Sequence, residues 1–461
     1  MIQTIRNAWA VPELRKKILF TVFALLIFRL GSAIPVPYIN SELLALQLQS
    51  QSGTILGLMN AMSGSAFSMA TVLALSIQPY INSSIIIQLL TVAIPALERL
   101  AKEGGEEGRK KIASITRYAT VAIALLQGFG YYSLIKSYGL ISGGTLPAVW
   151  VGIVIVLSFT AGSAFLMWLG EQITEFGIGN GISIILFAGI VSRFPRMIRD
   201  CIQGVSIWNQ VKDGTITAEA VMESNPTVYK TVEDAQAYID QMSLAPWMIP
   251  VIIIGMLALV VFIVYISNAE RRLPVQYAKR VVGRKMYGGQ STHIPMKVNM
   301  SGVMPIIFAQ SIASLPATIG AFMGWNTDNS AMMRLFDTSK PFYSILYFFL
   351  IVGFSYFYAS MSFNPIEVSN NLKKNGGFIP GFRPGKPTAD FITKVLNKIT
   401  MFGALYLSVV AILPIVTGNI VGYSSLAIGG TSIIIVVGVA LETVKQMEAQ
   451  MLMRHYKGFL E

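Results

Sequence analysis

The chain has 461 residues, of which 53% are hydrophobic and only 13% are charged, and its formal net charge is +12. Soluble domains usually carry about 25% charged residues, so this composition excludes an ordinary soluble protein and predicts one that faces lipid. A single cysteine, Cys201, excludes an intrachain disulfide, and His293 and His455 are too few for a haem or histidine-metal centre unless carboxylates contribute.

Ten apolar segments are long enough to cross a bilayer as helices, which takes about 20 residues each. In chain order they are 18–36, 71–97, 118–135, 147–170, 180–197, 246–267, 299–320, 341–363, 399–417 and 424–442. The predicted fold class is therefore an all-α polytopic membrane protein with ten transmembrane helices. Most of the 35 Lys and Arg residues fall in the segments that are cytoplasmic when the N-terminus is inside, which predicts that both termini are cytoplasmic.

The segment between the first two spans is irregular. Gly53, Gly57 and Gly64 lie among serines ahead of a short apolar run at 67–76. Non-helical backbone at membrane depth persists only when it is buried in protein or lines a cavity. Two interpretations stay open, which are a short re-entrant element inside a pore at about 60–72 and an ordinary outer loop.

A polar outer segment, 198–245, divides the ten spans into two sets of five, within an N-terminal half (1–197) and a C-terminal half (246–461). An odd number of spans per half means that equivalent halves lie upside down relative to each other, as in many membrane carriers. The outer segment is rich in acidic residues and carries no recognisable chemistry.

Two inner segments, 268–298 and 364–398, are longer and more basic than simple connections. Long ordered loops often carry function. We therefore expect a docking platform for a cytosolic partner, whose phosphates or acidic side chains would meet these bases.

Apart from Arg29, which lies near the outer end of the first span, where its side chain can reach the lipid headgroups, none of the ten predicted spans has Asp, Glu, Lys, Arg or His well inside it. Proton-coupled carriers usually have ionisable groups at the membrane midplane, so a secondary transporter is the less favoured alternative. An apolar constriction can still seal a pore, and Ile81 and Ile85 share one helical face. No catalytic constellation or phosphate-binding loop is present, so we expect no enzyme activity, cofactor or metal.

Six stretches resemble, in family order, the signatures of the SecY family of protein-translocating channels. They are SIQPYINSSIIIQLL at 76–90, EGGEEGRKK at 103–111, GIGNGIS at 177–183, QSTHIPMKVN at 290–299, IPGFRPG at 379–385 and GGTS at 429–432. Each stretch is modest alone, but together they cover nearly the whole chain. The resemblance implies a channel that passes unfolded secretory proteins across the bacterial cytoplasmic membrane and releases transmembrane segments sideways into lipid.

The resemblance also implies functional residues. A ring of apolar side chains would form the constriction, at Ile81, Ile85, Leu186, Ile307 and Ile435. A plug helix at about Ala61–Thr71 would close the outer side, with Ser63, Gly64, Ala66 and Phe67 among its residues. A lateral gate would open between the second and seventh spans, past Ser84, Gln88 and Gln310.

The implied partners are the membrane subunits SecE and SecG, the SecA motor, the ribosome, signal sequences and nascent chains, and anionic lipid. The cytosolic partners would dock on basic residues of the two long inner segments. These are Arg271, Arg272, Lys279, Arg280, Arg284, Lys285, Arg383 and Lys386.

Overall fold

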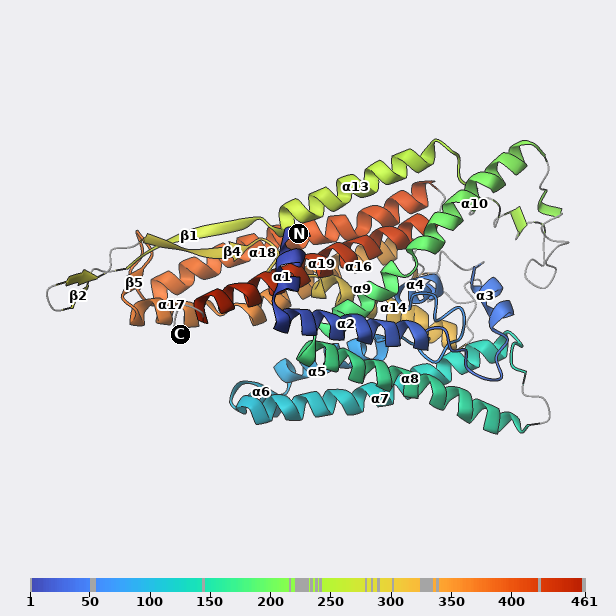
Figure 1. Ribbon diagram of the computed structural model, residues 1–461, viewed down its shortest axis with the longest axis horizontal. Helices are drawn as coiled ribbons and strands as arrows, with labels where there is room; N and C mark the ends of the chain where they lie inside the picture. The colour runs from blue at the N-terminus through green and yellow to red at the C-terminus, as the bar shows by residue number, and fades with distance from the viewer. Residues whose placement is uncertain are drawn as a thin grey trace.

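Long apolar helices lie side by side along the longest axis of the computed structural model (Figure 1). The structure describes residues 2–49, 55–142, 146–214, 217–219, 232, 235–236, 239, 243–277, 280–282, 285–287, 291–300, 302–323, 335–336, 340–421 and 424–457. A small sheet stands at one end of the bundle, next to the start of helix α18 (Figure 1).

Each predicted span contains a helix. In the first half these are α2 (Pro12–Gly31), α5 (Gln78–Ala93), α7 (Gly105–Ser137), α8 (Ala148–Phe176) and α9 (Gly181–Val191). In the second half they are α13 (Met248–Ser267), α14 (Met304–Phe322), α16 (Pro341–Ser362), α18 (Lys386–Val421) and α19 (Ser424–Lys457). Helix α2 runs away from the sheet end whereas α13, its counterpart, runs toward it (Figure 1), as inverted halves require.

Seven helices in the described part of the chain are long and apolar enough to cross a membrane. An eighth span results if α5 and the short helix α6 (Pro95–Lys102), which meet at a bend of 104°, are counted together. The chain is thus a multi-pass membrane protein, as predicted.

Further helices connect or extend these spans. They are α1 (Ile2–Ala10), α3 (Ser41–Gln49), α4 (Ile55–Met62), α10 (Phe194–Lys212) and α17 (Pro365–Lys374). Proline occupies the first or second position of α2, α5, α14 and α16, where its missing N–H costs no helical hydrogen bond. Helix α9 begins instead at Asn180, whose side chain accepts a hydrogen bond from the Ile182 amide at 3.1 Å.

The chain is mostly helical, as the predicted fold class requires, and the two long inner segments also contain short strands, which the sequence analysis did not predict. Strand β1 (Glu270–Tyr277) pairs antiparallel with β4 (Ser291–Lys297) and with β5 (Gly377–Phe378), in the order β4-β1-β5. Two further short strands, β2 (Arg280–Val282) and β3 (Lys285–Tyr287), form a hairpin. In β1, buried Leu273 and Val275 alternate with exposed neighbours, the pattern of a strand with one covered face.

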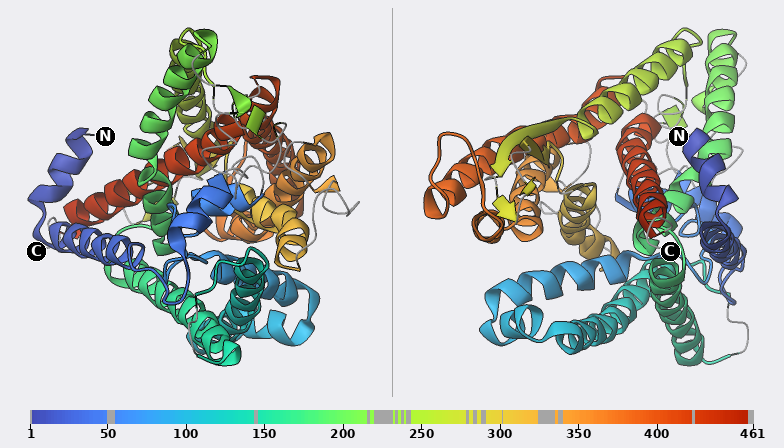
Figure 2. Two further views of the ribbon diagram at one scale, coloured as in Figure 1. Left: turned by 90° about the vertical axis from the view of Figure 1, so that its right-hand side faces the viewer. Right: turned by 60° about the vertical axis from the view of Figure 1, so that its left-hand side comes forward.

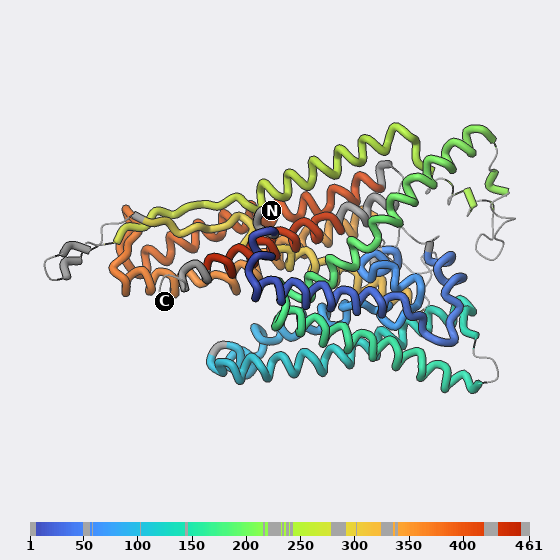
Figure 3. Tube along the Cα trace, in the orientation of Figure 1, coloured from blue at the N-terminus to red at the C-terminus, as the bar shows by residue number. Residues whose placement is uncertain are grey.

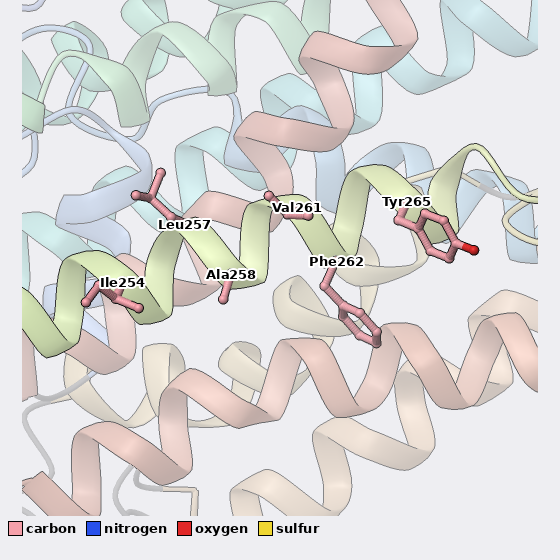
Figure 4. Close-up of a pocket in the computed structure, with 6 residues that line it drawn as sticks. All are labelled: Ile254, Leu257, Ala258, Val261, Phe262 and Tyr265. Atoms are coloured by element: carbon pink, nitrogen blue, oxygen red, sulfur yellow. The ribbon is translucent and has the colours of Figure 1, made fainter.

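Helix α13 has the least buried span in the bundle as described. Its Ile254, Leu257, Ala258, Val261, Phe262 and Tyr265 line a shallow apolar groove (Figure 4). Phe262 points toward the neighbouring helix α18, where its ring meets that of Tyr406 edge to face at 5.6 Å. The other groove residues lie on the outer surface of the bundle, so this groove is separate from the interior.

Candidate pore, plug and lateral gate

The five predicted ring residues come from four helices. Ile81 and Ile85 lie on α5, Leu186 on α9, Ile307 on α14 and Ile435 on α19. Each is at most 2% exposed, and all five belong to one cluster of buried apolar side chains. The fold therefore brings together residues that are up to 354 positions apart in the chain, and it draws them from both halves.

The apolar cluster around these residues consists of aliphatic and aromatic side chains with alanine and Met62. Such side chains attract one another without direction and bind water poorly, so a narrow opening lined by them excludes water and ions. The five ring side chains together can therefore act as a seal.

The expected plug helix at Ala61–Thr71 was wrong in its bounds. The helix, α4, ends at Met62, and the residues after it form turns up to Ile77. Positive φ angles at Gly64, Ser65, Ala70 and Ser76 prevent a right-handed helix from continuing through this stretch.

The segment from Leu56 to Ile77 is nonetheless mostly buried, which favours the re-entrant element over an ordinary outer loop. Ser63, Ala66 and Phe67 are at most 1% exposed. Helix α4 contacts α9 of the first half and both α14 and α19 of the second. In the view along the bundle axis, the blue chain after α2 lies near the middle of the helices (Figure 2). We call residues 55–77 the plug segment.

Aromatic packing fixes the middle of the plug segment. The ring of Phe67 stacks on Tyr131 of α7 with centroids 4.4 Å apart, and the Tyr131 hydroxyl donates a hydrogen bond to the Phe67 carbonyl oxygen. Tyr131 also meets Phe322 of α14 at 6.4 Å. On the other side, Thr318 of α14 contacts the Met59 sulfur at 3.8 Å. The plug segment thus fills the space between the two halves.

The predicted lateral gate coincides with a real contact, because α5 packs against α14. Gln310 is 3% exposed on α14, and Ser84 and Gln88 are half-buried on α5, where the Gln88 amide donates to the Ser84 hydroxyl at 3.3 Å. The sequence reasoning missed Tyr358 on α16. Its hydroxyl donates to Gln88 Oε1 at 2.5 Å, and its ring lies 5.2 Å from that of Phe308 on α14.

The two long inner segments form one structure, because β5 of the second completes the sheet of the first. A core that includes Leu273, Val275, Met296, Leu372 and Ile392 joins this sheet to α17 and α18. The Cα trace shows β1 and β4 running beside the orange helices of the second half (Figure 3). We call residues 268–298 and 364–398 the platform.

The predicted docking residues that can be placed lie on the surface of the platform. Arg271, Arg272, Arg383 and Lys386 are exposed, and Arg272 forms an ion pair with Glu270 at 2.7 Å. Arg383 stands in a turn between Gly381 and Gly385, whose φ angles are +89° and +104°, conformations that favour glycine. Arg280 and Lys285 lie in β2 and β3, whereas Lys279 and Arg284 lie outside the described residues.

Comparison with protein families gives a match to the SecY family over residues 71–444. The chain belongs to the SecY family. Relatives include the proteins named protein translocase subunit SecY of Streptomyces coelicolor, at 44% identity over all of both chains, and of Bacillus subtilis, at 42% identity over all of both chains. The family predicted from the six sequence stretches is confirmed.

Solved structures support the same fold at lower identity. One described as the structure of a protein conducting channel has a TM-score of 0.60 at 16% identity, covering 94% of this chain and 92% of that one. The Sec61 channel in the canine ribosome-channel complex has a TM-score of 0.57 at 16% identity, covering 94% of this chain and 92% of that one. The fold of these channels therefore extends over nearly the whole chain.

Proposed function

We propose that this chain is the protein-conducting channel of a translocase in the bacterial cytoplasmic membrane, with both termini in the cytoplasm. The observation that carries the proposal is the buried apolar ring of Ile81, Ile85, Leu186, Ile307 and Ile435, drawn from both halves beside the plug segment. A channel for proteins has to admit every kind of side chain, and an apolar ring makes no specific hydrogen bonds that would select among them.

In the idle state two barriers act in series. The ring excludes water and ions from the narrow part, and the plug segment occupies the space on its outer side. An unfolded chain that enters from the cytoplasm displaces the plug segment and spreads the ring. The aliphatic side chains then pack around the translocating chain and limit the leak of ions.

Sideways release uses the seam between α5 and α14. A signal sequence or nascent transmembrane helix partitions through this seam into lipid because its apolar surface is more stable there. The Tyr358–Gln88 hydrogen bond ties α5 of one half to α16 of the other, so we expect it to break when the seam opens.

The platform binds the cytosolic partner. Its exposed arginines, with Arg383 at the tip of a turn, suit the acidic surface of a SecA motor or the phosphates of a ribosome, and neighbouring bases suit anionic lipid. SecE and SecG complete the complex in the membrane.

The test is reconstitution of the chain with SecE and SecG in vesicles, followed by addition of SecA, ATP and a secretory precursor. Precursor that becomes protected from added protease only when both ATP and this chain are present supports the proposal. Vesicles without the chain, and a precursor without its signal sequence, serve as controls. If neither SecA nor translating ribosomes yield protected or inserted product, the channel proposal fails and a small-solute transporter becomes the better interpretation.

A further inference from the structure

Arg29 does not simply extend to the headgroups, as the sequence suggested. It lies in the last turn of α2, and its Nη1 donates to the Gly64 carbonyl oxygen at 3.5 Å and to the Ser192 hydroxyl at 3.4 Å. Gly64 lies in the plug segment just after α4, and Ser192 caps the outer end of α9. One guanidinium group therefore joins three separate parts of the first half.

The plug segment is seated closely against α9 at this point. Gly64 has φ of +67°, and a Cβ there would lie 2.7 Å from the Ser192 hydroxyl and 2.9 Å from the Gly189 carbonyl oxygen. A Cβ at Gly189 would in turn lie 2.7 Å from the Met62 carbonyl oxygen. Since both positions are glycine, the two backbones touch, and the Gly64 carbonyl is held where Arg29 reaches it.

The charge at this contact has a physical role that a neutral side chain could not fill. The Gly64 carbonyl lies two residues beyond the C-terminal end of α4, where the helix dipole is negative. A cation placed there forms charge-assisted hydrogen bonds, which are stronger than neutral ones.

The contact is also suited to breaking and forming again. The Arg29 side chain is exposed, so the guanidinium can be rehydrated when the plug segment leaves. A fully buried ion would instead be left unpaired at high cost. Stability of the closed state and ease of opening are therefore compatible here.

We propose that Arg29 is a positioning residue that latches the plug segment in its closed seat, through Gly64 and with Ser192 as the fixed point on α9. The proposal rests on the proposed channel function. It predicts that loss of the latch frees the plug segment without harming the conducting path, because Arg29 is not part of the ring, the seam or the platform.

The test uses the full chain with its membrane partner subunits in right-side-out bacterial membrane vesicles. Cys201→Ser removes the native thiol, and Ala66→Cys places a reporter at a position that is 1% exposed in the closed structure. A membrane-impermeant maleimide then measures how often the plug segment opens. This reporter background must first export a precursor as well as the parent chain.

We expect Arg29→Gln to raise the labelling rate about fivefold, which is the effect of one modest hydrogen bond on an equilibrium, and to raise the ion leak while normal precursor is still exported. Arg29→Lys, which keeps a cation, should restore slow labelling in large part. Arg15→Gln makes the same change at the exposed cytoplasmic end of α2 and should leave the labelling rate at the parent value.

Ser192→Ala sharpens the test. If Arg29 and Ser192 act as one unit, their effects on the labelling rate are not independent. The fold-increase in the double variant Arg29→Gln with Ser192→Ala should then be smaller than the product of the two single fold-increases. The latch would be overturned if an Arg29→Gln channel still exports and its labelling rate is unchanged. It would also be overturned if this variant shows reduced export and reduced thermal stability without faster labelling. A parent chain that fails to export would instead refute the channel function, and the labelling assay separates the two because it needs no translocation.

Discussion

The five ring residues are at most 2% exposed in an apolar cluster, whereas Arg271, Arg272 and Arg383 stand exposed on a platform held by strand pairing. The ring is held by contacts without direction, so it can change shape around a passing chain. The platform is fixed by backbone hydrogen bonds and its own small core, so it can present charges at set positions. Under the proposed function, the part that would accept any sequence is deformable, and the part that would recognise a partner is rigid.

The largest effect should come from a polar side chain in the ring. Ile307→Asn buries an amide that has no partner when the ring is closed, which costs about 1–3 kcal/mol and favours hydrated, open states. We expect the ion conductance of idle channels in planar bilayers to rise at least about fivefold, and precursors with defective signal sequences to pass more often. Ile81→Asn should act in the same direction.

The matched control for the ring is Ile86→Asn, which lies on the same helix as Ile81 but is 44% exposed on its outer side. This variant should leave the conductance near the parent value. Equal leak from Ile86→Asn and Ile307→Asn would show that the seal does not reside at the ring.

A charge reversal on the platform should have an intermediate effect. Arg383→Glu places a carboxylate at an exposed turn that we expect to face an acidic partner, so SecA-driven export should slow by about tenfold through weaker binding. The fold should be unaffected, because the Arg383 side chain is exposed and only its backbone carbonyl accepts a bond, from Thr388 at 2.8 Å. Export is measured as protease-protected precursor over a range of SecA concentrations.

Lys212→Glu is the matched control for the platform, since it reverses an exposed charge at the end of α10, beyond the outer end of the fifth span. It should export normally. A normal rate with Arg383→Glu at low SecA concentration would remove Arg383 from the docking surface.

The same comparison explains how far the sequence could be interpreted. The spans follow from apolar length, and the pairing of Ile81 with Ile85 follows from helical spacing. That Leu186 and Ile435 join them was available only from the family resemblance, because no local pattern links positions so far apart. The pairing of β5 with β1 was missed because its partners, such as Gln276 and Phe378, are separated by the whole seventh and eighth spans.

The plug segment resisted prediction for a different reason. Ser65, Ala70 and Ser76 adopt positive φ, which their residue types rarely do, so composition gave no sign that α4 stops at Met62. Arg29 was visible as a charge inside the first span, but its contacts with the Gly64 carbonyl and the distant Ser192 hydroxyl leave no mark in the sequence. Tyr358 lies 270 positions from Gln88 and was equally hidden.

The smallest effect should come from the bond that holds the seam. Tyr358→Phe removes one hydroxyl and keeps the ring contact with Phe308. The equilibrium between the closed and the open seam should therefore shift toward the open state by about 1 kcal/mol, or roughly fivefold. The readout is the fraction of a marginally hydrophobic test segment that is released into lipid, with Tyr356→Phe on the same helix as the control, since its hydroxyl contacts the Asn397 carbonyl at 3.4 Å and not α5. The idle ion leak should stay at the parent value, because the ring and plug segment are untouched. A rise in leak equal to that of Ile307→Asn would mean that the seam and the ring are one cooperative barrier, and the contrast between a deformable seal and fixed contacts around it would no longer hold.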